Sequence, residues 1–190
     1  MYRVILFFIF LTFSSTVLAQ DYTPKGEVFG SIGGGKAYDD EGGIGSGLDF
    51  GGGVGYRITP KLQIEGAINT IRHERNFGSG VVFKGTGTFV SANLLYHFST
   101  KQVQPYVIGG AGFVNHQNRS RFPEDPFTPE VSSSGGAFNF GAGLRVFLNK
   151  HISIRPEFRV FVGYPDSSRL RSVEAPFSVL RGSVSVSYHW

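Results

Sequence analysis

Charged side chains inside otherwise apolar or small-residue segments are the first candidates for chemistry in this 190-residue sequence. These residues are Asp49, Glu65, Arg145, Arg155, Glu157, Arg159 and Arg181. With Arg57 counted, five arginines accompany three acids, and guanidinium groups pair strongly with carboxylates away from water. We therefore predict an ion network that fills a narrow interior and has a structural role. A gated ion path through the same interior is the alternative.

Metal, thiol and phosphate-loop chemistry has little support. The five histidines include no pair at the i, i+4 spacing of a helical zinc site and no HExxH motif. The absence of cysteine excludes disulfides, zinc–cysteine sites and thiol nucleophiles. The acidic residues 39–41 lack an EF-hand pattern, and the glycine-rich stretches lack a GxxxxGK motif. We predict no catalytic residue, no cofactor and no metal site.

The elements that must position the charged residues are strands. Eight segments alternate between apolar side chains and polar or small ones, which is the period of a strand. They cover residues 27–36, 48–57, 62–69, 90–98, 106–115, 138–148, 154–162 and 180–190. In the fifth segment we assign Tyr106, Ile108, Gly110, Gly112 and Val114 to the outward apolar face. The first segment, which is rich in glycine, has the weakest pattern.

The connections between these segments alternate in length. Residues 58–61, 99–103 and 149–151 form short turns, whereas residues 37–46, 72–84, 117–134 and 163–177 form long polar loops. Short turns at one end and long loops at the other predict an antiparallel meander without crossover helices.

The N-terminus has the features of an export signal. Arg3 precedes an unbroken apolar run at residues 4–11, and small or short residues follow at positions 17–19. The run is too short to span a bilayer as a helix. We predict a cleavable signal peptide at residues 1–19 and a single mature domain at residues 20–190.

The polar faces decide between a soluble lipocalin-like barrel and a membrane barrel. They are rich in glycine, serine and asparagine and poor in lysine, unlike a surface that meets water. Aromatic residues expected at strand ends on the apolar face are Tyr56, Tyr96, Phe98, Tyr106, Tyr188 and Trp190. Interfacial girdles have this composition. We predict an all-β, eight-stranded, antiparallel up-and-down transmembrane β-barrel with a polar interior.

Glycine accounts for 27 residues, all at or after position 26. On the predicted strands Gly51, Gly53 and Gly55 line the interior, and Gly110 and Gly112 fall on the lipid side. Small residues on both faces suit a narrow, tightly curved barrel.

The order of several short stretches resembles the small outer-membrane β-barrel domains of Gram-negative bacteria related to OmpA and OmpX. The stretches are residues 53–60, 94–98, 105–112, 141–145 and 184–190. The resemblance implies an outer-membrane location, outer-membrane lipid and lipopolysaccharide as surroundings, and delivery by periplasmic chaperones to the barrel-assembly machinery. From the even number of strands and the three short turns we expect both termini on the periplasmic side. The assembly signal maps to Val184, Val186, Tyr188 and Trp190. Unlike the longer members of that family, this chain is expected to have no peptidoglycan-binding domain after the barrel.

The predicted function is an envelope-integrity or surface-interaction role carried by four long extracellular loops. Possible contacts with lipopolysaccharide phosphates are Arg119, Arg121, Arg169 and Arg171. One alternative is a small-solute channel of OmpW type. A less favoured alternative is a lipid A-modifying enzyme, since some related barrels use histidine and serine and the chain has a His151–Ser153 pair. The basic residues are scattered, so no nucleic-acid partner is expected.

Overall fold

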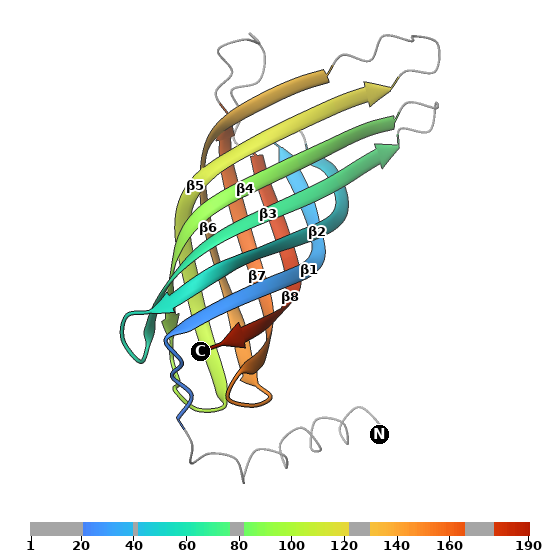
Figure 1. Ribbon diagram of the computed structural model, residues 1–190. Helices are drawn as coiled ribbons and strands as arrows, with labels where there is room; N and C mark the ends of the chain where they lie inside the picture. Colours follow the sequence, from blue (N-terminus) through green and yellow to red (C-terminus); the bar gives the residue numbers. More distant parts are fainter. Residues whose placement is uncertain (1–20, 40–41, 77–81, 122–129, 166–176) are drawn as a thin grey trace, which may run out of the picture.

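The computed structural model describes residues 21–39, 42–76, 82–121, 130–165 and 177–190. They form eight antiparallel strands that close into one barrel, in which each strand pairs with its sequence neighbours and β8 pairs with β1 (Figure 1). The strands are β1 (Gly26–Asp39), β2 (Gly42–Arg57), β3 (Leu62–Asn76), β4 (Val82–His97), β5 (Val103–Arg121), β6 (Glu130–Phe147), β7 (Ile152–Pro165) and β8 (Phe177–His189). The predicted fold class is confirmed. The predicted signal peptide lies outside the described residues.

Barrel closure depends on the pairing of the first and last strands. Val28 pairs with Tyr188 and Ile32 with Val184, and the start of β1 and Trp190 lie at the same end as the three short turns (Figure 1). A closed ladder leaves no edge strand with unpaired backbone groups. With eight strands the interior is just wide enough to be filled by side chains. Within the described part of the chain, no helix has the length and apolar character needed to cross a bilayer.

At the other end the strands are longer than the sequence indicated. Residues 132–134, predicted as loop, pair with residues 115–117 of β5, and Arg119 pairs with Glu130. Only residues 40–41, 77–81, 122–129 and 166–176 separate the described strands there. The four predicted loops were therefore too long. Serine, glycine and threonine residues continue the strand pairing there, but they show no alternation of apolar and polar residues from which a strand could be predicted.

The faces of β5 were assigned the wrong way round. Tyr106 and Val114 are each 1% exposed and face the interior, whereas Phe113 is 73% exposed on the outer wall. Gly110 and Gly112 belong to the interior stripe with Tyr106, not to the lipid side. Both faces of this strand carry apolar or small residues, so its alternation could not show which face was which. Tyr106 consequently leaves the predicted aromatic girdle.

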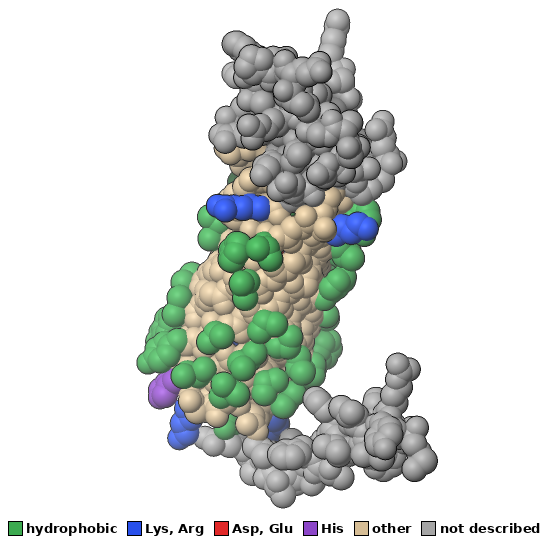
Figure 2. All heavy atoms as spheres, turned by 90° about the vertical axis from the view of Figure 1, so that its right-hand side faces the viewer, with side chains coloured by type: hydrophobic (Ala, Val, Ile, Leu, Met, Phe, Trp, Pro, Cys, Tyr) green, Lys and Arg blue, Asp and Glu red, His purple; other side chains and the backbone are tan. Residues whose placement is uncertain are grey.

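The outer wall is apolar over its middle, and the face in Figure 2 shows no acidic side chain. The five other predicted girdle residues, Tyr56, Tyr96, Phe98, Tyr188 and Trp190, are 43–62% exposed there. The interior, however, is not uniformly polar as predicted. Toward the long-strand end it holds an apolar cluster, which we call the inner apolar cluster: Ala37, Ile71, Phe89, Val114, Ala137, Phe161, Phe177 and Val179.

Candidate functional site: the barrel interior

Glu157 on β7 lies at the centre of the charged interior. Its carboxylate accepts hydrogen bonds from Arg159 Nε at 2.9 Å and from Arg159 Nη2 at 2.8 Å, a bidentate arrangement. The Tyr106 hydroxyl donates to the same carboxylate at 2.8 Å. Arg181 Nη1 lies 3.4 Å from Glu157 Oε1. Because β5, β7 and β8 all supply partners, this one carboxylate connects non-adjacent strands across the interior.

Arg155 joins the opposite wall of the barrel. Its Nη1 donates to Glu65 Oε2 on β3 at 2.7 Å and to Glu27 Oε1 on β1 at 3.2 Å. The guanidinium also lies over the ring of Phe29, 4.2 Å from the ring centroid. Glu27 in turn accepts from Arg145 Nη2 on β6 at 2.8 Å. These pairs bring β1, β3, β6 and β7 into one network.

The pair nearest the long-strand end is Asp49 with Arg181. Arg181 Nε donates to Asp49 Oδ2 at 2.5 Å, and its Nη2 donates to Ser31 Oγ at 3.0 Å. The two charged side chains are 0% and 3% exposed. The pair spans β1, which lies between β2 and β8 in the barrel.

The ion pairs join equal numbers of opposite charges. Four carboxylates (Glu27, Asp49, Glu65 and Glu157) and four guanidinium groups (Arg145, Arg155, Arg159 and Arg181) take part. The network is therefore neutral when every member is ionised. Neutrality matters because an unmatched charge at low dielectric is costly.

Sequence reasoning named seven of these eight residues and missed Glu27. A signal was present, because Glu27 and Ser31 share the inward stripe of the glycine-rich first strand. Arg57, counted among the pairing arginines, instead donates to Pro60 O at 2.6 Å and to Gln104 Oε1 at 3.1 Å.

Amide side chains extend the network. Gln63 Nε2 donates to Glu27 Oε1 at 2.6 Å, and Arg145 Nη1 donates to Gln63 Oε1 at 3.0 Å. Farther along, Asn139 Nδ2 donates to Asn93 Oδ1 at 2.9 Å. All these side chains are buried. Among the described residues, Arg145 Nε and Asn139 Oδ1 have no hydrogen-bond partner, so the network is extensive but not every polar atom in it is satisfied.

Glycines make room for these side chains at close quarters. A Cβ at Gly143 would overlap the phenol of Tyr106, and one at Gly55 would overlap the amide of Gln63. Gly51 gives the same space to Asn69. The interior glycines therefore accommodate polar groups on the neighbouring strands.

The residues before β1 cross the short-turn end of the barrel. Tyr22 N donates to the carbonyl of Thr100 in the β4–β5 turn at 2.7 Å, and Gln104 Nε2 donates to the carbonyl of Tyr22 at 2.7 Å. The Tyr22 ring stacks on Phe147 of β6, with centroids 4.9 Å apart. Since β1 is not adjacent to β4, β5 or β6, this segment covers the mouth of the interior; we call residues 21–25 the strap.

Exposed contacts hold Asp21, in the strap, to the β4–β5 turn. The Thr100 hydroxyl donates to Asp21 Oδ1 at 2.8 Å, and Lys101 Nζ lies 3.0 Å from the same oxygen. The hydrogen bond from Thr100 and the charge of Lys101 hold the pKa of Asp21 below its ordinary value.

One set of interior groups has the order of a catalytic triad. Ser153 Oγ lies 2.8 Å from His189 Nε2, and His189 Nδ1 lies 3.6 Å from Glu27 Oε2. Ser153 is 0% exposed, and Phe147 packs against the His189 ring at a centroid distance of 4.8 Å. Acyl transfer needs backbone or side-chain N–H groups that point at an oxyanion. The backbone around Ser153 and His189 is instead paired with the neighbouring strands. The arrangement cross-links β1, β7 and β8.

The sequence suggested His151 and Ser153 as a pair, but their side chains lie on opposite sides of the barrel wall. His151 stacks on the outward Tyr188 ring, with centroids 5.9 Å apart, whereas Ser153 faces the interior. Neighbouring residues i and i+2 share a face only within a regular strand, and His151 lies in the turn before β7. No group of histidine and acidic residues in the described chain could hold a metal ion.

Residues 5–169 match the model of the outer membrane protein beta-barrel domain, which is most of the chain. The chain belongs to this family. Among curated proteins, none matches the sequence.

Solved structures show the same barrel fold in other members of the outer-membrane class. Neisserial surface protein A is 16% identical with a TM-score of 0.56, covering 85% of this chain and 96% of its own. Ail of Yersinia pestis, solved with the heparin analogue sucrose octasulfate, is 16% identical with a TM-score of 0.55, covering 86% and 99%. A major outer membrane protein of Thermus thermophilus is 14% identical with a TM-score of 0.56, again covering 86% and 99%. At these identities the likeness shows the fold alone.

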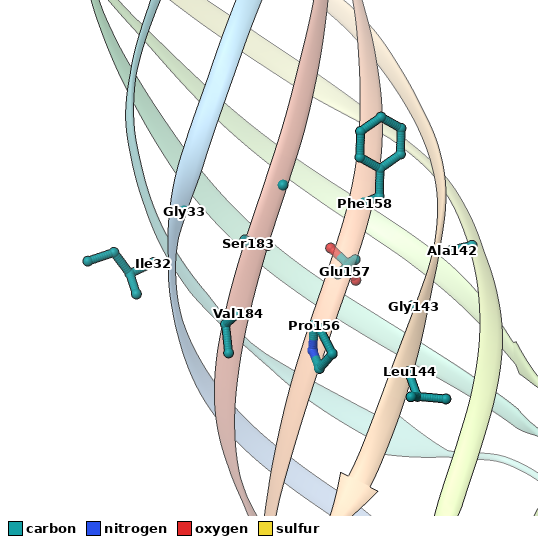
Figure 3. Close-up of a pocket in the computed structure, with 11 residues that line it drawn as sticks. Ile32, Gly33, Ala142, Gly143, Leu144, Pro156, Glu157, Phe158, Ser183 and Val184 are labelled. Atoms are coloured by element: carbon teal, nitrogen blue, oxygen red, sulfur yellow. The ribbon is translucent and has the colours of Figure 1, made fainter. Parts of the chain in front are cut away.

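The outer wall of this family member faces lipid, and its depressions are apolar. A shallow depression of about 670 Å³ crosses β6, β7, β8 and β1 (Figure 3). Ala142 and Gly182, which lie on either side of Phe158, leave this space because their side chains are short or absent. Glu157 also borders it, but its carboxylate is bound by Tyr106 and Arg159 on the interior side. The depression therefore offers space for lipid chains and no reactive group.

The remaining predicted site residues divide into two groups. Val184, Val186, Tyr188 and Trp190 point outward from the end of β8, and a Cβ at Gly26 would contact the Trp190 indole. The side chains of Arg119, Arg121, Arg169 and Arg171 and of residues 39–41 lie outside the described part of the structure.

Proposed function

We propose that this outer-membrane barrel is a non-enzymatic structural component of the envelope, with a closed interior and both termini on the periplasmic side. The observation that carries the proposal is the neutral network of four carboxylates and four guanidinium groups across the interior. A permeating ion would have to separate pairs that hold non-adjacent strands together. The strap at one end and the inner apolar cluster at the other add two further barriers.

A catalytic role has less support from the same geometry. Ser153 and His189 are buried beneath Phe147 at the end of the barrel where the strap crosses. A lipid substrate would lie against the outer wall, on the other side of the strand. An unchanged lipid A mass spectrum after overexpression agrees with a non-enzymatic protein, and loss of an acyl chain or a phosphate would contradict it.

The envelope role is tested in a deletion strain of the native host. We expect the strain to become more sensitive to detergent and to large antibiotics, and wild-type protein to restore resistance. The Ser153→Ala variant is the matched control, because removal of the hydroxyl should not impair a structural protein. Restoration by wild type but not by Ser153→Ala, with equal amounts of folded protein, would contradict the proposal.

Membrane orientation follows from the same proposal. An epitope placed within residues 77–81 should be labelled by antibody on intact cells, and one placed within residues 149–151 should be labelled only after permeabilisation. The reverse pattern would place the long-strand end in the periplasm.

Surface contact with lipopolysaccharide is the second part of the proposed role. Arginine matches phosphate geometry, and Arg169 and Arg171 follow β7 at the end proposed to be extracellular. Reversal of both to glutamate should weaken lipopolysaccharide binding by the refolded protein. Unchanged binding would remove these two residues from the proposal.

A further inference from the structure

Lysines gather at the short-turn end of the barrel. Four of the six lysines in the chain lie there: Lys25 in the strap, Lys61, Lys101 and Lys150, one in each short turn. We call these four residues the lysine rim. Asp21 is the one acidic side chain in the strap and the three turns, and it engages Lys101 at 3.0 Å. Lys25, Lys61 and Lys150 are exposed, and no ion pair within the described residues involves them.

The lysine rim borders the apolar band directly. Three apolar side chains next to the lysine rim are exposed on the outer wall: Ile58 (54%), Leu148 (58%) and Trp190 (62%). Ile58 and Leu148 lie within three residues of a rim lysine, and the backbone of Trp190 is hydrogen-bonded to that of Lys25. Lysines just beyond such a belt extend their ammonium groups to the level of lipid headgroups. Figure 2 shows basic side chains at both margins of the apolar band.

We propose that Lys25, Lys61 and Lys150 bind the phosphates of anionic phospholipids in the leaflet at the short-turn end. A ring of separate lysines, with the Asp21 carboxylate engaged by Lys101, suits point-charge contact with several headgroups rather than one shaped pocket. Only the identification of that leaflet as the periplasmic one rests on the orientation given under the proposed function. Lipid is favoured over the anionic cell-wall polymer because the lysines border the membrane-facing band.

Trp190 provides a built-in reporter beside the lysine rim, because it is the single tryptophan of the chain. Its carbonyl accepts a hydrogen bond from Lys25 N at 3.0 Å, and the preceding residue, His189, donates its backbone N–H to His151 O in the Lys150 turn at 2.7 Å. The experiment measures quenching of Trp190 in symmetric vesicles that contain brominated phosphatidylglycerol or brominated phosphatidylcholine. Symmetric leaflets make the result independent of the direction of insertion.

We expect brominated phosphatidylglycerol to bind beside Trp190 about fivefold more tightly. This preference equals about 1 kcal/mol, the attraction of one headgroup to one basic residue near the surface. The triple variant Lys25→Gln, Lys61→Gln, Lys150→Gln should remove this preference. Lys36→Gln is the matched control, because Lys36 is exposed toward the long-strand end, 5.1 Å from the Tyr38 ring centroid. Half-molar salt should reduce the wild-type preference and leave phosphatidylcholine quenching unchanged. A gel shift verifies that each variant is folded.

Equal quenching by both lipids in wild type would overturn the proposal, and so would a preference that survives in the triple variant. Binding to purified cell-wall sacculi is measured alongside. If the triple variant loses sacculus binding but keeps its lipid preference, the lysine rim serves the cell wall instead. A conducting pore would refute the closed interior without changing the quenching ratio, so the two proposals fail separately.

Discussion

Replacing Asp49 by asparagine should destabilise the barrel, because Arg181 would keep its charge in the interior without its nearest partner. The two side chains are 0% and 3% exposed, and Arg181 Nε lies 2.5 Å from Asp49 Oδ2. Two unit charges about 4 Å apart interact by about 4 kcal/mol at an effective dielectric constant of 20. Removal of one partner of a buried pair typically costs about 3–5 kcal/mol. Arg181 keeps weaker contacts with Glu157 at 3.4 Å and Ser31 at 3.0 Å, so we expect about 3 kcal/mol.

The assay is urea unfolding of the refolded protein in lipid vesicles, followed by the gel mobility of unheated samples. With an m-value of about 2 kcal/mol per molar, a loss of about 3 kcal/mol lowers the midpoint by about 1.5 M. Arg181→Gln should cost at least as much, because Asp49 then has no guanidinium beside it. The double variant restores neutrality and should be less destabilised than the sum of the single variants by about 2 kcal/mol or more.

Asp21→Asn is the matched control, since it makes the same chemical change in the exposed pair with Lys101. Its midpoint should not move measurably. If Asp49→Asn leaves the midpoint unchanged, or if the effects of Asp49→Asn and Arg181→Gln are additive, the ion pair between Asp49 and Arg181 does not stabilise the barrel.

Three further substitutions test other parts of the interior. Gly143→Ala should lower the unfolding midpoint, because the new Cβ would overlap the phenol of Tyr106, whereas Gly66→Ala should not, because nothing lies within 4 Å of that position; equal midpoints would mean that the interior readily repacks. Phe89→Ala should cost about 3–5 kcal/mol by leaving a cavity beside Phe161, and a cost below about 1 kcal/mol would show that the inner apolar cluster is loosely packed. Glu65→Ala should lower the temperature at which the unheated gel band shifts, because Arg155 loses its contact at 2.7 Å; an unchanged temperature would show that Glu65 does not stabilise the barrel.

The sequence was most informative where one face of a strand differs clearly from the other. On β7, Arg155, Glu157 and Arg159 alternate with apolar residues, so their shared inward face followed directly from the period of two. On β5 both faces are apolar or small, and Tyr106 was placed outside although its hydroxyl donates to Glu157. In such a strand, the pairing register with the neighbouring strands determines which side chains face the interior. Register depends on tertiary contacts and is not visible in the local sequence.

Other features depend on contacts between distant parts of the chain. The strap places Tyr22 beside Thr100 and Phe147, and no local pattern around Tyr22 indicates these partners. Glu27 was missed because glycine dominates β1 and weakens its alternation. The inner apolar cluster arises because residues such as Phe89 and Phe177, near the ends of the predicted segments, continue inward stripes beyond the charged residues.

Single-channel recording shows whether the barrel interior is closed to ions. Refolded wild-type protein is inserted into a planar bilayer in molar salt, and insertion is verified by gel shift of the same preparation. The neutral network, the strap and the inner apolar cluster together predict no steady conductance. A reproducible, steady conductance from folded wild-type protein would contradict a closed interior and favour a solute path through the barrel.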